Sequence, residues 1–220
     1  MISADWIRAF RVNEPFPDPD PSPSVQPRDV TDESTHAFGR ACTYDVVFSV
    51  LDDDGGSASD AIRVLIAGNA DRGRPTGYWA QQYRQRGGVD FDAATLGCYL
   101  EIAGFVSAVF HERRDASTFP KAQAVLLDQG KPVSKRDQLD RDLLTAWLNF
   151  ANGAVGWNEQ VDTNGDGAVD IAFSVAMQAA EAVRLNPSAT AAQLDAQRAI
   201  DRAGDQRRAV NERSSASGRL

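Results

Sequence analysis

The stretch TYDVVFSVLDDDGGSASDAIRVLIAG, Thr43 to Gly68, alternates apolar and polar residues on both sides of an Asp/Gly cluster. The alternation predicts two strands, because successive side chains of a strand point to opposite faces. The residues that would share an apolar face are Tyr44, Val46, Phe48 and Val50, followed by Ile62, Val64 and Ile66. Asp52–Gly56 supplies the residues that tolerate the positive φ angles of a reversal. We therefore expect a β-hairpin with Arg63 on its opposite face, and interpret DDDGG as a turn rather than a metal site.

The chain changes character on both sides of this hairpin. Upstream, PFPDPDPSPSVQP at 15–27 holds six prolines, a composition typical of an extended linker. Downstream, the period becomes helical from Gly77 onward. The first expected helix is capped by Asp92 and carries an apolar stripe from Leu96 to Phe110, and a short helix at 120–127 ends before Gly130. A third is capped by Ser134 and Asp137 and stops at Gly153. The last two span 171–185, where Pro187 ends the helix, and a segment capped by Ser188.

These patterns predict a mixed α and β fold that is mainly α: a short β-hairpin or partial β-sandwich followed by a bundle of about five helices. The expected organisation is a Pro-rich linker at 1–29, a β-segment at 30–70, a helical domain at 76–206, and a disordered tail at 207–220.

Composition excludes some classes of function. The chain has 220 residues and a net charge of −8, which argues against a nucleic-acid binder because such proteins need a basic surface. The sequence has no apolar run long enough for a membrane span and no visible secretory signal. Two cysteines, Cys42 and Cys98, allow one disulfide, but two buried thiols are an equally good interpretation.

The segment STHAFGRACTYDVVFSVLDDDGGSASDAIRVLIAG at 34–68 resembles the C-terminal half of a PKD-type, immunoglobulin-like repeat. The resemblance rests on His36 and Phe38 before Gly39, the alternation from Tyr44, the DGG turn and the final Val-Ile strand. It implies an extracellular spacer or adhesion element. The first half of such a module should lie upstream, where this chain has prolines. A few strands cannot bury a core of their own, so the β-segment is expected to be truncated or to pack on the helices or a partner.

GYW at 77–79, LGCYL, LLTAWLNFANG and the aspartate loop together resemble helical modules of secreted bacterial proteins that commonly follow β-sandwich repeats. The resemblance bears on location more than on activity.

DTNGDGAVDIAF, Asp162 to Phe173, resembles the calcium loops of EF-hand and dockerin type. Calcium takes six to eight oxygen ligands, and such loops place them at alternate positions. The predicted ligands are Asp162, Asn164, Asp166, Asp170 and, through its carbonyl, Ala168, with Gly167 allowing the sharp bend. Glu159 lies close enough in sequence to add a carboxylate.

Position twelve of this loop holds Phe173, where a bidentate acid is expected. The loop should therefore bind calcium weakly, at roughly 10⁻⁴ to 10⁻³ M. A dockerin would need a second loop and an acid at position twelve, and this chain has neither. The alternative is a plain turn with Asp170 as a helix N-cap.

Other groups of residues give weaker indications of function. His36 and His111 lack the spacing of a zinc site, and Cys98 is better explained by core packing than by pairing with His111 as a nucleophile. Trp79 and Tyr83 could form an aromatic platform for sugars, but anchoring a helical core is the favoured interpretation.

The leading hypothesis is a non-enzymatic structural, adhesion or interaction module of a secreted or cell-surface bacterial protein, with a weak structural calcium site and a protein or polysaccharide surface as partner. A calcium-independent intracellular interaction domain is the alternative. A glycan-active enzyme ranks last, because the sequence singles out no pair of catalytic carboxylates.

Overall fold

The computed structural model describes residues 9–11, 35–51, 56–127, 133–164, 166, 168–198 and 200. Predictions about the proline-rich segment at 15–27, the turn at 52–55, Gly130, Gly167 and the tail at 207–220 lie outside the described residues. The chain divides into two compact units. The β unit comprises Met1–Gly39 and Thr43–Leu65, and the helical unit comprises Arg40–Cys42 and Ile66–Leu220.

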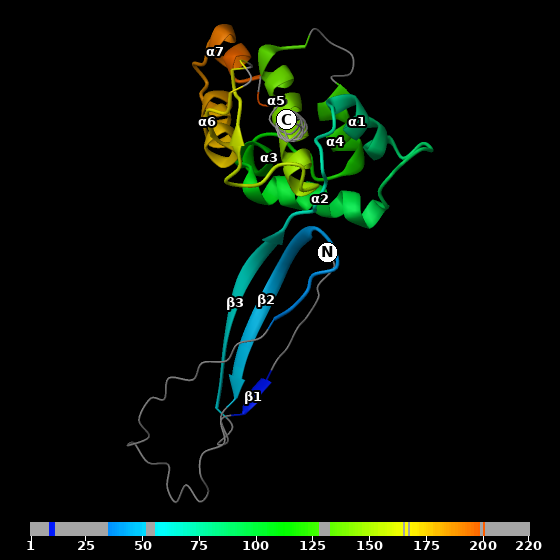
Figure 1. Ribbon diagram of the computed structural model, residues 1–220, viewed down its shortest axis with the longest axis vertical. Coiled ribbons are helices and arrows are strands. Elements are labelled where there is room, and N and C mark those ends of the chain that lie inside the picture. Colours follow the sequence, from blue (N-terminus) through cyan, green and yellow to red (C-terminus); the bar gives the residue numbers. More distant parts are fainter. Residues whose placement is uncertain are drawn as a thin grey trace, which may run out of the picture. The chain divides into compact units, whose positions relative to one another are not determined.

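The β unit contains the predicted hairpin (Figure 1). Strands β2 (Cys42–Leu51) and β3 (Ser57–Ile66) are neighbours in a three-stranded sheet of order β1-β2-β3. Strand β1 (Ala9–Arg11) pairs with β2 in parallel, with Ala9 opposite Ser49. This short strand lies inside the stretch predicted to be linker at 1–29, so that prediction is wrong for residues 9–11. Their pairing is with a distant strand, which local composition does not reveal.

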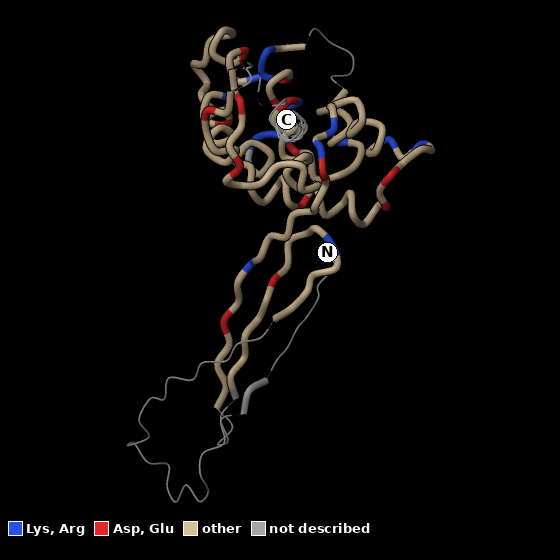
Figure 2. The backbone as a smooth tube through the Cα atoms, in the orientation of Figure 1, with Lys and Arg blue, Asp and Glu red and all other residues tan. Residues whose placement is uncertain are grey.

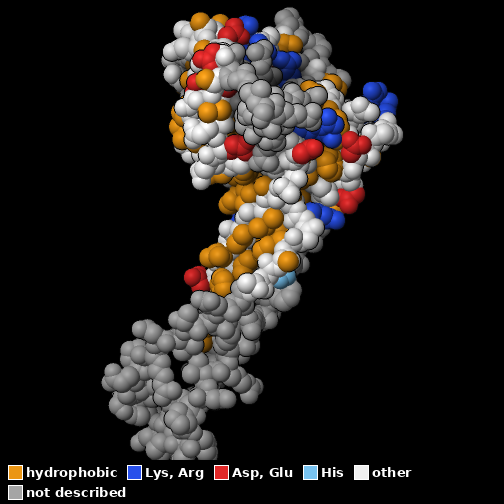
Figure 3. All heavy atoms as spheres, viewed as in Figure 1, with side chains coloured by type: hydrophobic (Ala, Val, Ile, Leu, Met, Phe, Trp, Pro, Cys, Tyr) orange, Lys and Arg blue, Asp and Glu red, His pale blue; other side chains and the backbone are white. Residues whose placement is uncertain are grey.

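Arg63 lies on the face of the hairpin that also carries Asp45, opposite the alternating apolar residues, as predicted. Asp45 and Arg63 form an exposed two-pronged ion pair across β2 and β3, with Nε–Oδ1 and Nη2–Oδ2 distances of 2.6 and 2.8 Å. They are two of the few charged residues on these strands (Figure 2). Apolar side chains remain accessible along the sheet (Figure 3), and Phe48 is 53% exposed.

The helical unit holds seven helices in its described part, against about five expected. They are α1 (Thr76–Arg84), α2 (Ala93–Val106), α3 (Ala108–Glu112), α4 (Phe119–Leu127), α5 (Lys135–Ala151), α6 (Phe173–Leu185) and α7 (Ala191–Ala196). The predicted class, mixed and mainly α, is confirmed. No described helix has the length and apolar character needed to cross a membrane.

Several helix ends follow the predicted local chemistry. Asp92 caps α2 by accepting a hydrogen bond from Thr95 N, and Ser134 and Asp137 form a reciprocal capping box at the start of α5. Such caps are typically worth about 1 kcal/mol each. Two predictions about α2, α3 and α7 were wrong. The stripe from Leu96 to Phe110 is broken at Ser107, whose side chain caps α3, and α7 is capped by Thr190 rather than Ser188.

Helix α5 occupies the centre of the helical unit (Figure 1) and contacts α1, α2, α4, α6 and α7. Its polar side chains are therefore buried with specific partners. Asn149 accepts hydrogen bonds from Arg74 N at 2.8 Å and from Trp79 Nε1 at 3.0 Å. Trp79 is fully buried, so it anchors the core and cannot serve as a sugar platform.

The segment after β3 is fastened to the end of α5. Gly68 N donates to Ala151 O at 2.8 Å, and Ala70 N donates to Asn152 O at 3.0 Å. Gly153 terminates the helix with φ +83°, as predicted for a C-terminal glycine. Because the two backbones approach so closely, neither Gly68 nor Gly153 has room for a side chain.

Candidate metal-binding loop and its surroundings

A two-stranded ribbon holds both ends of the aspartate loop. Strands β4 (Gln160–Val161) and β5 (Ile171–Ala172) are antiparallel, with Val161 opposite Ile171. Backbone bonds from Asp170 N to Val161 O and from Phe173 N to Glu159 O close the ribbon at 2.9 and 2.8 Å. The ribbon continues directly into α6. The helix begins two residues later than predicted, since residues 171–172 belong to β5.

The side chains predicted to bind calcium turn the loop by bonding to its own backbone. Asp162 Oδ1 accepts from Asn164 N, Asn164 Oδ1 from Asp166 N, and Asp166 Oδ1 from Ala168 N, at 3.0, 2.8 and 2.8 Å. Each is an Asx-type turn, in which a short polar side chain bends the chain two residues ahead. This repeat explains why polar residues stand at alternate positions. Asp162 is buried, whereas the other predicted ligands are exposed.

Asp170 folds back across the loop instead of capping the helix. Its Oδ2 accepts from Thr163 N and Thr163 Oγ1 at 3.0 and 3.1 Å, and Asn164 Nδ2 lies 3.5 Å from its Oδ1. The N-cap of α6 is Ala172, which makes no side-chain cap. The alternative role for Asp170 as an N-cap is therefore wrong. The fold instead directs this carboxylate toward the second and third positions of the loop.

The loop carboxylates are not gathered around one point. Among the described residues, one group of three His, Cys, Asp or Glu side chains brings its potential ligand atoms within 4.8 Å of one another. That group is Cys42, Cys98 and Glu101, and it includes no residue of the loop. Calcium binding at Asp162, Asp166 and Asp170 would require their side chains to converge. Three acids within nine residues repel one another, and a cation relieves that repulsion.

The residue at position twelve belongs to the hydrophobic core. Phe173 is fully buried and meets Trp147 edge-on and Phe150 in a stacked arrangement, with ring centroids 5.6 and 5.9 Å apart. Trp157 also stacks on Trp147, with its ring centroid 6.1 Å away. The nearby Glu159, proposed as an additional ligand, accepts a hydrogen bond from Gly156 N at 2.8 Å and so stabilises the turn before β4.

Cys42 and Cys98 form a disulfide, which joins the start of β2 to α2 with 4.7 Å between the Cα atoms. The interpretation of two separate thiols is therefore wrong. Glu101 Oε2 lies 3.4 Å from Cys42 Sγ. Since both sulfurs are used in the disulfide, this trio has no thiolate to offer a metal, and Cys98 cannot act as a nucleophile with His111.

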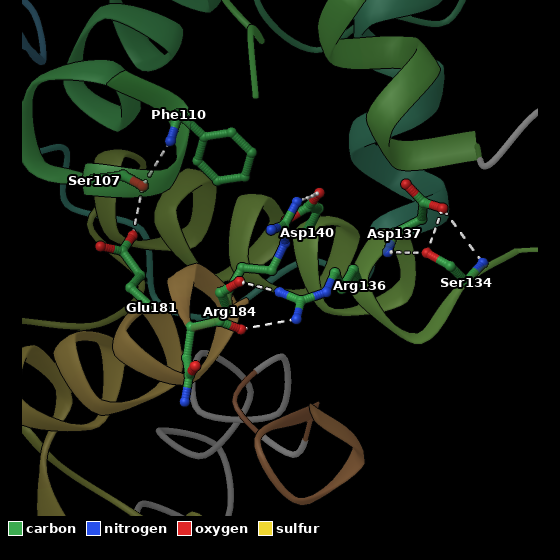
Figure 4. Close-up of polar contacts among 9 residues, drawn as sticks. Ser107, Phe110, Ser134, Arg136, Asp137, Asp140, Glu181 and Arg184 are labelled. Atoms are coloured by element: carbon green, nitrogen blue, oxygen red, sulfur yellow. Dashed lines mark hydrogen bonds and ion pairs between the residues drawn. The ribbon is translucent and has the colours of Figure 1, made fainter. Parts of the chain in front are cut away.

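A buried carboxylate, Glu181, links three helices in this unit, and Figure 4 shows its contact with Ser107. Its oxygens accept from Ser107 Oγ at 2.5 Å, Trp147 Nε1 at 2.8 Å and Ala108 N at 3.0 Å. The sequence motifs around the aspartate loop give no role to Glu181. Glu181 follows Met177 by four residues and Phe173 by eight, which places it on the apolar stripe of α6, a pattern that could have revealed its burial.

A second buried group fastens α6 to α5. Asp140 is fully buried and receives Arg184 Nε and Nη2 at 2.5 and 2.8 Å. Burial raises the pKa of Asp140, and the Arg184 guanidinium opposes that rise. Arg136 binds the carbonyls of Arg184 and Asn186 at the end of α6, at 2.7 and 2.8 Å (Figure 4). These contacts join the C-terminal end of α6 to α5.

Comparison of the chain with protein-family models, curated proteins and solved structures finds no match.

Proposed function

We propose that this chain is a non-enzymatic module of a secreted or cell-surface protein, in which the loop at Asp162–Asp170 binds one structural calcium ion weakly. The observation that carries the proposal is the succession of Asx turns within a ribbon-closed loop. It places oxygen-bearing side chains at alternate positions, the arrangement that calcium loops use. Ala168 would contribute its carbonyl oxygen.

The structural role of the metal follows from what the loop connects. The loop lies between the turn after α5 and the start of α6, and Phe173 immediately follows β5 in the core. A calcium ion at the loop would offset most of the repulsion among the three carboxylates and hold the ribbon closed. Because Phe173 and Trp147 are packed together, the expected effect is added stability rather than a large opening movement.

The disulfide supports the proposed location. Disulfides persist in oxidising compartments and are rare in the reducing cytosol, apart from redox enzymes and hyperthermophile proteins. Both sulfurs are buried in the helical unit, as in a structural disulfide. The partly exposed apolar sheet of the β unit is consistent with the resemblance to half of a β-sandwich repeat. We propose a protein or polysaccharide surface as the partner.

The test is thermal unfolding of the full chain with and without calcium. At ten times its Kd, a ligand specific for the folded state adds about 1.4 kcal/mol of stability, so calcium should raise the Tm by a few degrees. Asp162→Ala/Asp166→Ala should abolish this response. The control Asp60→Ala/Asp71→Ala removes two charges outside the loop and should retain it. A wild-type Tm that does not change in millimolar calcium would contradict the proposal.

A further inference from the structure

The helical unit contains a half-open cavity of about 500 Å³. Its walls come from the second half of α2, from α3 and from the loop that follows α3. This cavity is distinct from the aspartate loop, since none of the residues that line it belongs to the loop. Its volume suits a small organic molecule.

The floor of the cavity is apolar. Leu100, Gly104 and Phe110 line it, and Leu100 and Phe110 are only 5% and 7% exposed. Their positions are fixed by the core of the unit, so the cavity is preformed. A flat or ring-shaped apolar group could lie on this floor and remove both itself and the floor from water.

The rim of the cavity is basic. Arg113, Arg114 and His111 line it. The one acid in the loop of the rim, Asp115, is already compensated, because it forms an ion pair with Lys121 and accepts hydrogen bonds from Ser117. Within the described part of the chain, the Arg113 side chain has no hydrogen bond or ion pair. In a chain of net charge −8, this basic rim is a local attraction for anions.

The α2 wall of the cavity also carries an acid, Glu101. Its carboxylate would repel a dianion such as phosphate more strongly than a monoanion. A planar guanidinium matches a carboxylate with two parallel hydrogen bonds. We propose that this cavity binds a small organic monocarboxylate, with its apolar ring on Leu100 and Phe110 and its carboxylate at Arg113.

Nuclear magnetic resonance titration of the full chain tests the proposal with three probes. 2-Naphthoate carries both the ring and the charge, 2-naphthamide carries the ring alone, and inorganic phosphate carries charge without a ring. We expect 2-naphthoate to shift the amide resonances of residues 100–117, and the other two probes to leave them nearly unchanged. Resonances of the aspartate loop should not move, which separates this site from the calcium proposal.

Substitutions at the rim test whether Arg113 contacts the bound carboxylate. Arg113→Ala should weaken 2-naphthoate binding about ten-fold, because it removes a charge-assisted hydrogen-bonded pair. Arg113→Lys should retain part of the affinity, and the control Arg86→Ala, an exposed arginine outside the cavity, should bind like wild type. Glu101→Gln should strengthen phosphate binding. The proposal is overturned if residues 100–117 do not respond to 2-naphthoate, if 2-naphthamide binds equally well, or if Arg113→Ala and Arg86→Ala behave alike.

Discussion

The ring of Phe173 meets the indole of Trp147 edge-on, with 5.6 Å between the ring centroids. Phe173 follows β5 directly and is also stacked on Phe150, so the residue that closes the aspartate loop is one of the most enclosed in the molecule. This position supplies packing energy, because burying a Phe side chain contributes about 1.5–3 kcal/mol and aromatic pairs add to it.

Restoring an acid at position twelve should therefore damage the protein. Phe173→Glu buries a charge among aromatic rings and should lower the free energy of unfolding by about 3 kcal/mol or more, without a gain in calcium response. Val175→Glu is the matched control on the same helix, since Val175 is 46% exposed in the first turn, where an acid is favoured. Denaturant unfolding measures both. A Phe173→Glu variant as stable as wild type would contradict the assignment of Phe173 to the core.

Alanine substitutions at Gly153 and Gly97 should have opposite effects on stability, because Gly153 closely approaches Gly68, whereas a Cβ at Gly97 would meet no other segment. A Cβ on Gly153 would lie 1.9 Å from Gly68 O, and its φ of +83° disfavours any side chain. Gly153→Ala should destabilise by more than about 1–3 kcal/mol, the usual cost of such backbone strain alone. Gly97→Ala, in helix α2 with open space around it, should stabilise by about 0.5–1 kcal/mol. Equal stabilities of the two variants, measured by denaturant unfolding, would refute this.

Removing the disulfide should lower the stability of the helical unit. Cys42 and Cys98 are separated by 56 residues, and a bridge over a loop of this size typically contributes about 2–4 kcal/mol. Cys42→Ser/Cys98→Ser should therefore reduce the Tm, and reductant should reduce the Tm of wild type but not of the double variant. Thiol titration of the unfolded, unreduced protein checks the assignment directly: finding two free thiols would show that the bridge is absent.

Three tyrosines should make the fold sensitive to alkaline pH. Burial raises the pKa of Tyr99 to about 12, burial and the hydrogen bond to Asp90 raise that of Tyr78 to about 12, and burial raises that of Tyr83 well above its ordinary value of 10.0. A raised pKa means that the folded state holds the phenol proton more tightly than the unfolded state. The associated stability is complete below pH 10 and is lost as pH rises toward 12.

Tyrosinate absorbance and circular dichroism, followed together, measure this loss. We expect most of the tyrosinate signal to appear only as the helices unfold. Tyr99→Phe removes one titrating group and should make the stability of the remaining fold less dependent on pH in this window. Ionisation of Tyr78, Tyr83 and Tyr99 with midpoints near pH 10, while the helical signal stays intact, would contradict the prediction.

Local chemistry determined much of this protein. The hairpin, the caps of α2 and α5, and the stop at Gly153 follow from neighbours in sequence, because alternation, capping and turn formation depend on residues only a few positions apart. The Asx turns of the aspartate loop belong to the same class, since each joins a side chain to the backbone two residues ahead.

The tertiary structure decided the features that join distant segments. The pairing of Cys42 with Cys98, the burial of Glu181 against Ser107 and Trp147, the position of Phe173 in the aromatic core and the contact of Gly68 with Gly153 all depend on how the helices pack around α5. The cavity at Arg113 is of the same kind, because its walls are surfaces of separate elements. Residue types in one segment do not specify which distant surface they will face, and packing resolves that choice.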